Sequence, residues 1–449
     1  MKLPLSFFLL TLTLFATTQE KVISKNLTLS DALHKVKSSN LELAIAKYEI
    51  DLKNKAKWSA HAMRLGTLDL TQNIMRSNDA GNVFGFKLSA REASFNDFGF
   101  AEYTGDGTVE PVDLNYPGIR DYYQTKLTYK LPIFVGGKLF AGANISSAMH
   151  DIAKLQGKEL ELQKIYQVKK SFYDIALLEG FLDNLKKVKK NVTTIETMTK
   201  TMVTEGYARK VDLLEVKSKK ASISRLISQS EANHKLALHF LSFLLNEPVS
   251  AIDTKSIKDV TKKAAKYQIE ELLMVKKAQK GLSIANSMVW IARADYLPTI
   301  GAFAEISSAD DTFGGDFEDH KSFTVGVQAK WNVFDGFRTT LQVEQAKLAR
   351  LKATAQFNLA KKGLALQISK LETEISSLEA EKKSLNAEIS FQKKIVENYH
   401  NRYAEKLAKI TDVMMAESTY IKKILELNKI SNQQNDKALQ LQMITLGDQ

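Results

Sequence analysis

The sequence predicts a membrane protein of the α+β class, in which long antiparallel helical hairpins alternate with amphipathic strands. Three features of the 449-residue chain lead to this prediction: two long stretches without proline, segments in which apolar and polar residues alternate, and an internal repeat with a period of roughly 200 residues. Proline breaks helix interiors, so its absence allows long helices. Alternation over about ten residues is typical of strands that face lipid on one side.

The chain begins with a pattern typical of a secretory signal peptide. Lys2 precedes an apolar run over residues 3–15, and small and polar residues follow. A charged, an apolar and a small-residue region in this order indicate export, and we assign the signal to residues 1–19. No later run of about 18 uncharged apolar residues occurs, so we expect no membrane-spanning helix.

The two halves of the chain share motifs in the same order. WSAHAMRLGTL, starting at Trp58, resembles WIARADYLPTI, starting at Trp290. IFVGGK, starting at Ile133, likewise resembles VFDGFR, starting at Val333. A period of this length is too long for a solenoid and indicates a duplicated domain, an internal two-fold repeat. The predicted parts are the signal peptide at 1–19, the first repeat at 20–245, an equatorial linker at 246–266 and the second repeat at 267–449.

Each repeat contains a stretch that we expect to form a long helical hairpin. No proline occurs between Pro132 and Pro248 or after Pro298, and apolar residues in both stretches recur at steps of three and four. This spacing is typical of a coiled-coil seam. A helix from about residue 138 to 205 would be on the order of 100 Å long, and a reversal would return the chain alongside it. The hairpins are predicted at 138–245 and 338–446.

Each repeat also contains two predicted strands. Residues 323–333 alternate strictly between apolar and polar side chains, and residues 126–133 do so in the first half. With two weaker partners, they give β-hairpins at 66–133 and 299–333. Four strands cannot close a barrel, and lipid does not tolerate an open sheet edge. We therefore expect assembly with copies of the chain; two copies supply 8 strands and three supply 12, and a lumen that passes solutes favours the larger number.

The sequence contains no constellation typical of an enzyme, a cofactor site or a metal site. It has no Cys, and its seven His residues form none of the zinc-binding spacings. Those in predicted helices, such as His400, are interpreted as surface or packing residues. The acidic segment 308–320 lacks the ligand spacing of a Ca²⁺ loop and is interpreted as a solvated loop. The net charge of +12 is spread along the chain, which favours solvated helix faces over a nucleic-acid partner.

Four motifs carry a family resemblance: LSDAL from Leu29, YLPTI from Tyr296, VFDGF from Val333 and ITDV from Ile410. Through them the chain resembles the TolC-type outer-membrane efflux protein family over nearly the whole mature sequence. The resemblance implies a homotrimer with a 12-stranded transmembrane β-barrel in the Gram-negative outer membrane. It also implies a trimeric α-barrel that crosses the periplasm and docks onto an adaptor (membrane fusion) protein and an inner-membrane transporter.

The function implied by the resemblance is that of an exit duct in a tripartite efflux or type I secretion system. Such a duct is a passive conduit that is gated at its periplasmic helical tips and driven by the inner-membrane pump. An alternative of another class is a trimeric, membrane-anchored surface fibre or adhesin with a coiled-coil stalk, and a third is a soluble basic coiled-coil scaffold. A fibre would usually carry one barrel segment at one end of the chain, so strands in both halves favour the conduit.

The resemblance places the gate at the two reversals. Asp212 and Asp412 match aperture carboxylates of the family, and Tyr403 matches a Tyr whose polar contacts hold the tips shut. The tip turns contain Gly206, Lys406, Leu407 and Ile410. An alternative and compatible role for both Asp residues is that of N-caps.

The tips also depart from the family pattern at three positions. Lys406 stands where the family commonly has Gly. Met415 and Ala408 stand where its best-known members have a second aperture Asp and an Arg that locks the tips. We therefore expect this gate to depend more on packing, by Leu407, Ile410 and Met414.

Overall fold

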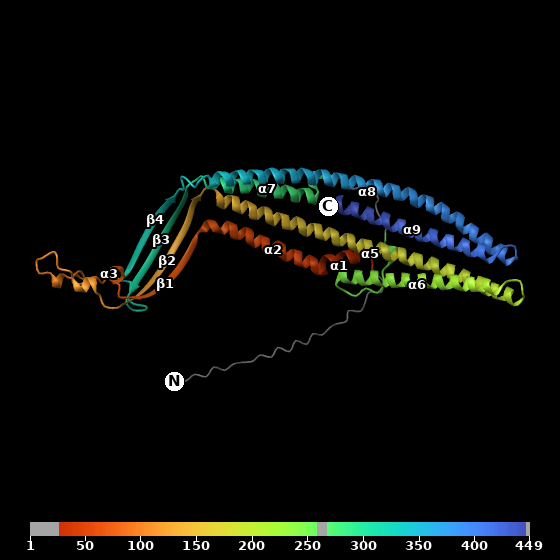
Figure 1. Ribbon diagram of the computed structural model, residues 1–449, viewed down its shortest axis with the longest axis horizontal. Helices are drawn as coiled ribbons and strands as arrows, with labels where there is room; N and C mark the ends of the chain where they lie inside the picture. The colour runs from red at the N-terminus through yellow and green to blue at the C-terminus, as the bar shows by residue number, and fades with distance from the viewer. Residues whose placement is uncertain (1–26, 258–266, 446–449) are drawn as a thin grey trace, which may run out of the picture. The chain divides into compact units, whose positions relative to one another are not determined.

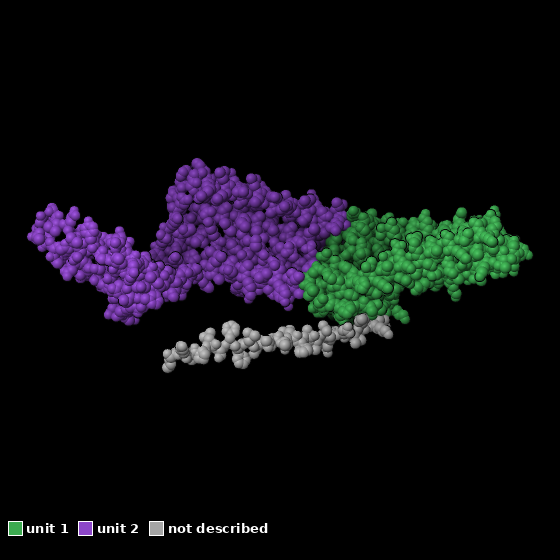
Figure 2. All heavy atoms as spheres, turned by 60° about the horizontal axis from the view of Figure 1, so that its bottom comes forward, with its two compact units in different colours: residues 1–43, 161–265, 368–446 green, residues 44–160, 266–367, 447–449 purple. Residues whose placement is uncertain are grey.

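The computed structural model describes residues 27–257 and 267–445, so the predicted signal peptide and the last part of the predicted linker lie outside the described residues. The chain divides into two compact units (Figure 2). Unit 1 comprises residues 1–43, 161–265 and 368–446; unit 2 comprises residues 44–160, 266–367 and 447–449. Both units draw on segments from the two halves of the chain, because the two longest helices contribute to each.

Unit 2 contains a four-stranded antiparallel sheet in the order β1-β2-β3-β4 (Figure 1). Leu70, Leu127, Ile306 and Phe323 lie in one row across it. The combination of long helices with four strands confirms the coarse fold prediction. The fourth strand ends three residues before the predicted Val333. The strands are β1 (Thr67–Ser77), β2 (Arg120–Val135), β3 (Thr299–Asp310) and β4 (Lys321–Lys330).

The two faces of the sheet differ in polarity. One face carries apolar side chains on every strand, and the row across it is exposed to different degrees, from 38% for Leu127 to 80% for Phe323. The opposite face is polar and is crossed by an ion pair of 2.9 Å between Lys126 and Glu305 and a hydrogen bond of 3.0 Å between Ser307 and Ser322. Strands β1 and β4 each have one edge without a neighbouring strand in the described chain.

Helices α2, α5, α7 and α8 join the sheet at one end, and the connection between β1 and β2, which contains α3 and α4, lies at the other (Figure 1). Helix α7 (Leu273–Ala294) pairs with the first part of α5 (Lys138–Thr204) through Lys277–Glu159 at 2.5 Å and Lys280–Asp151 at 2.6 Å. The elements of this unit are α2 (Leu41–Ala62), η1 (Met63–Leu65), α3 (Ala80–Ser89), η2 (Phe95–Phe98), η3 (Phe100–Glu102), α4 (Val112–Asn115), η5 (Ile269–Glu271) and α7 (Leu273–Ala294).

The described residues of unit 1 are helical, apart from a single parallel bridge between Leu27 and Ile252. Its core follows the apolar seams that the sequence predicted, since Val188, Val192 and Ile195 of α5 are buried against α6 (Lys210–Leu245) and α9 (Ile410–Thr445). No helix among the described ranges combines the length and the apolar character that crossing a membrane requires. The elements are α1 (Leu29–Ser39), α6 (Lys210–Leu245), η4 (Thr254–Ser256) and α9 (Ile410–Thr445), with parts of α5 (Lys138–Thr204) and α8 (Arg338–Ala404).

The two long hairpins have matching dimensions. Helices α5 and α8 each contain 67 residues, and α6 and α9 each contain 36. Both pairs start 200 residues apart (338 − 138 and 410 − 210). Each position in one tip therefore has a counterpart in the other.

Candidate functional site

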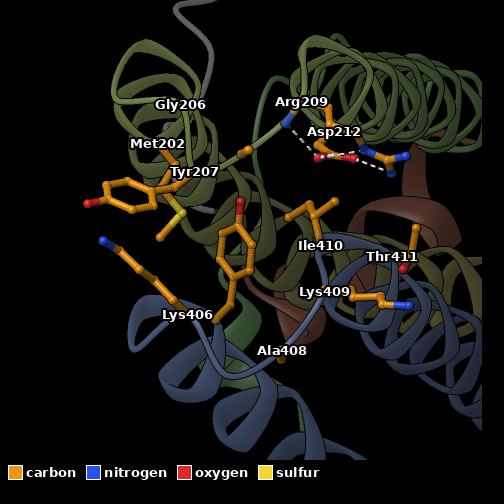
Figure 3. A pocket seen from close by; sticks show the side chains of 12 residues that line it. Met202, Gly206, Tyr207, Arg209, Asp212, Lys406, Ala408, Lys409, Ile410 and Thr411 are labelled. Carbon is orange, nitrogen blue, oxygen red and sulfur yellow. Dashed lines mark hydrogen bonds and ion pairs between the residues drawn. The ribbon is translucent and has the colours of Figure 1, made fainter.

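The two hairpin reversals lie side by side in unit 1 and enclose a cavity of about 460 Å³ (Figure 3). This cavity brings together five of the seven residues that the sequence predicted for the gate. Leu407 and Asp412 lie outside its lining. The lining residues are Met202, Gly206, Tyr207, Ala208, Arg209, Asp212, Tyr403, Lys406, Ala408, Lys409, Ile410 and Thr411.

Both reversals use the same hydrogen-bonded turn. Gly206 has a φ of 78° and Lys406 a φ of 64°. In each turn the N–H of the following residue donates to the carbonyl five residues earlier, at 2.8 Å after α5 and 2.7 Å after α8. A left-handed residue at this place is the usual way to end a helix, and glycine adopts it without the strain that a Cβ introduces. Lys406 and Gly206 therefore adopt the same left-handed conformation, which is strained for Lys406 because it has a Cβ and unstrained for Gly206.

Asp212 is the third residue of α6 and stabilises the start of that helix. Its carboxylate accepts a hydrogen bond of 2.9 Å from the backbone N–H of Arg209 and lies 3.0 Å from Nη2 of the same residue. The hydrogen bond from the Arg209 side chain holds the pKa of Asp212 below its ordinary value. The alternative assignment of Asp212 as an N-cap is wrong, because its side chain reaches back from inside the helix. Its charge is balanced by Arg209.

Asp412 occupies the same position in α9 but has a different environment. It is half-buried, and its carboxylate accepts a hydrogen bond of 3.4 Å from the backbone N–H of Lys409. Asp412 is therefore not an N-cap either. In the part of the chain that the structure describes, no cationic side chain lies within ion-pair distance of it. Of the two predicted carboxylates, Asp412 is the one whose charge is not compensated.

Tyr403 connects the two hairpins through a buried hydrogen bond. Its hydroxyl lies 2.8 Å from Oγ1 of Thr199 on α5, and both residues are buried. Burial raises the pKa of Tyr403, so the hydroxyl stays neutral. Ile410 and Met414 pack in the same core, whereas Leu407 is 63% exposed. Of the three expected packing residues, two are therefore buried within the chain and Leu407 is not.

Lys406 makes the second direct contact between the tips. Its Nζ lies 3.4 Å from the centroid of the Tyr207 ring, and Figure 3 shows the two side chains facing each other. An ammonium group over an aromatic face is attracted by the negative face of the ring. Sequence reasoning identified Lys406 as a departure but missed Tyr207 as its contact and Thr199 as the partner of Tyr403. The Arg209–Asp212 pair, by contrast, has an i,i+3 spacing that the sequence displays.

A buried polar pair lies on the second hairpin. Glu417 of α9 is fully buried, and Nε2 of His400 on α8 lies 3.0 Å from its Oε1. Within the described residues, neither Glu417 oxygen has a hydrogen bond of good geometry. His400 therefore contributes to the interior of the hairpin, which refines its interpretation as a packing residue.

Among the described residues, Glu92, Asp310 and His320 of unit 2 have the spacing of a metal site, with ligand atoms within 4.8 Å of one another. Their interactions favour a structural role. Arg120 pairs with Glu92. The Asp310 carboxylate already accepts the backbone N–H groups of Thr312 at 2.9 Å and Asp316 at 3.1 Å. The cluster organises the loops at the end of the sheet.

Comparisons with known proteins agree with this architecture. Residues 270–445 match the family described as outer membrane efflux protein. No curated protein sequence matches the chain. The chain is similar in structure to the outer membrane protein VceC from Vibrio cholerae, with 17% identity and a TM-score of 0.74 over 92% of this chain and 94% of VceC.

Two further solved structures share this fold. The Campylobacter jejuni CmeC outer membrane channel has 13% identity and a TM-score of 0.75 over 100% of this chain and 94% of its own. The open state of the Neisseria gonorrhoeae MtrE outer membrane channel has 14% identity and a TM-score of 0.76 over 94% of this chain and 89% of its own. The family consists of channel proteins and not of enzymes. The resemblance to TolC-type proteins is thus confirmed: residues 270–445 match the outer membrane efflux protein family, and the chain has the fold of the solved outer-membrane channels VceC, CmeC and MtrE.

Proposed function

We propose that the chain is the outer-membrane exit duct of a tripartite efflux or type I secretion system. The observation that carries this proposal is the four-stranded sheet, which has an exposed apolar face, a polar face and two open edges. Lipid tolerates an apolar face but not unpaired backbone groups at an edge. The open edges of β1 and β4 therefore pair with those of neighbouring copies.

The proposed assembly is a homotrimer in the outer membrane of a Gram-negative bacterium. Three copies of the sheet supply 3 × 4 = 12 strands, enough for a barrel with an open lumen. The long hairpins of the three copies form an α-helical tunnel in the periplasm. Their matching lengths support an internal two-fold repeat, so that six similar hairpins surround the tunnel.

The proposed gate is formed by the hairpin tips, and the conduit itself is passive. An inner-membrane transporter drives transport through a periplasmic adaptor that docks onto the tips. Opening requires the two tips of each chain to separate, which breaks the Tyr403–Thr199 hydrogen bond and the contact of Lys406 with Tyr207. Asp412 supplies the uncompensated carboxylate at the aperture, and three copies of it attract cations.

The test is the oligomeric state and ion selectivity of the purified protein. We expect a detergent-solubilised trimer that gives a cation-selective current in planar bilayers. Asp412→Asn should weaken the cation preference, whereas the matched variant Asp212→Asn should weaken it less, because Arg209 balances that charge. A monomer that is soluble without detergent, or a trimer that gives no current, would contradict the conduit and favour a scaffold or a surface fibre.

A further inference from the structure

The connection between β1 and β2, residues 78–119, lies at the end of the sheet away from α2, α5, α7 and α8, and its helix α3 contacts the sheet there (Figure 1). Phe86 of α3 stacks on Tyr122 of β2, with ring centroids 4.2 Å apart and planes inclined by 13°. Both rings are buried together with Ala309 of β3. Helix α3 is therefore seated on two strands rather than extended into solvent.

The face that α3 covers follows from the register of the strands. Side chains alternate between the two faces of a strand, so Tyr122 shares a face with Gln124 and Lys126. Ala309 shares the same face with Ser307 and Glu305 of β3. This is the polar face, which contains the Lys126–Glu305 ion pair. The apolar, exposed face of the sheet lies on the other side.

A second anchor holds the end of α3 on the polar face. Arg120 lies two residues before Tyr122 and thus on the same face of β2. Its guanidinium group pairs with Glu92, which follows α3, and lies 3.7 Å from Asp311, which follows β3. An aromatic stack and a charged contact therefore attach the same end of α3 to the same face.

We propose that α3, with the residues that follow it up to Glu92, forms a constriction at the outer mouth of the duct, which limits the size of the solutes that leave it. The inference rests on the proposed function: in a membrane barrel the apolar face contacts lipid and the polar face lines the lumen. A segment seated on the polar face lies inside the lumen. The three copies of α3 would surround the axis at the end away from the helical tunnel. This narrow point is distinct from the gate at the hairpin tips.

The position of α3 can be measured by spin labels on single cysteines, because the natural chain contains none. Ser89→Cys places a label on the exposed side of α3, and Val325→Cys places one on the apolar face of β4. In the purified assembly, the distances between copies should be shorter for Ser89 than for Val325, since labels inside the lumen lie nearer the axis. Equal or longer distances for Ser89 overturn the inference. The absence of any distance between copies for both variants overturns the proposed trimer, and the inference with it.

The effect on transport can be measured with the same two variants in planar bilayers. A polyethylene-glycol maleimide added to the outer side should reduce the current through Ser89→Cys and leave Val325→Cys unchanged. Labelling of the Ser89→Cys variant without loss of current, while the channel conducts normally, overturns the constriction but not the conduit. In a third variant, Phe86→Ala, the label at Ser89 should become more mobile, whereas Phe95→Ala, at an exposed ring, should leave it unchanged. Equal mobility in both would contradict the seating of α3 by its stack on Tyr122.

Discussion

The α5–α6 tip and the α8–α9 tip follow the same backbone path with different side chains. Both turns contain one left-handed residue and the same pair of hydrogen bonds, and both place an Asp at the third position of the following helix. The first tip pairs its Asp with Arg209 and exposes Lys210. The second has no ion pair at Asp412 in the described chain and buries Ile410.

This difference shows that one turn geometry can be stabilised in two ways. The first tip depends on a local and exposed ion pair, which contributes little because water screens it. The second depends on burial and on contacts that reach across to α5 and to Tyr207. We expect the second tip to control the separation of the two hairpins, and four sets of substitutions test this comparison.

The largest expected effect on the stability of a tip comes from Ile410, the first residue of α9, which is buried. Ile410→Ala should lower the free energy of opening of the second tip by about 2–5 kcal/mol, because it leaves a cavity in a packed core. Its counterpart Lys210→Ala, at an exposed position, should change stability by no more than about 0.5 kcal/mol. Hydrogen exchange of tip amides measures both values. Similar exchange rates in the two variants would remove the proposed asymmetry.

Tyr403→Phe should have the next largest effect. It leaves the buried hydroxyl of Thr199 without a partner, which should cost about 1–3 kcal/mol and raise the time that the channel spends open. The double variant with Thr199→Val removes both partners and should recover part of the loss. Single-channel recording and hydrogen exchange of the tips measure the coupling. Strictly additive effects of the two substitutions would show that the hydroxyl groups do not interact.

Exchanging the residues at the two left-handed positions should change the stability of the two tips unequally. Both changes should be smaller than those described above. Gly206→Lys should destabilise the first tip by about 1 kcal/mol, because a Cβ is strained at positive φ. Lys406→Gly should stabilise the second tip by less, since it also removes the contact with the Tyr207 ring, worth about 0.5–1 kcal/mol. Thermal unfolding of the detergent-solubilised protein gives both values. In a Tyr207→Leu background, the gain from Lys406→Gly should increase; an unchanged gain would argue against the contact.

The smallest expected effect is a dependence of the first tip on acid. Arg209 holds the pKa of Asp212 below its ordinary value, so the folded state favours the ionised carboxylate. The resulting stability is present above the unfolded pKa of about 3.9 and is lost as the pH falls through the lower folded pKa. Hydrogen exchange of the α6 start, followed from about pH 6 downward, measures it after correction for the intrinsic rates. Arg209→Gln should reduce this dependence, and an identical profile in that variant would assign it to other groups.

Features that follow local rules could be predicted from the amino-acid sequence alone. Proline-free stretches and apolar steps of three and four predicted the long helices, because these patterns act within a few residues of one another. Strict alternation predicted which side chains of β4 share a face. The motifs of the two halves revealed the family resemblance, and they predicted where the chain reverses in each half.

The contacts between distant parts of the site could not be predicted from local patterns and are visible in the folded chain alone. Tyr403 and Thr199 are 204 residues apart in the sequence, and no local pattern connects them. The same is true of Lys406 with Tyr207, and of Phe86, whose position between β1 and β2 did not indicate which face of the sheet it covers. The physical reason is that hydrogen bonding and periodicity act along the chain, whereas the pairing of side chains from distant segments depends on which faces of the packed helices and strands come together.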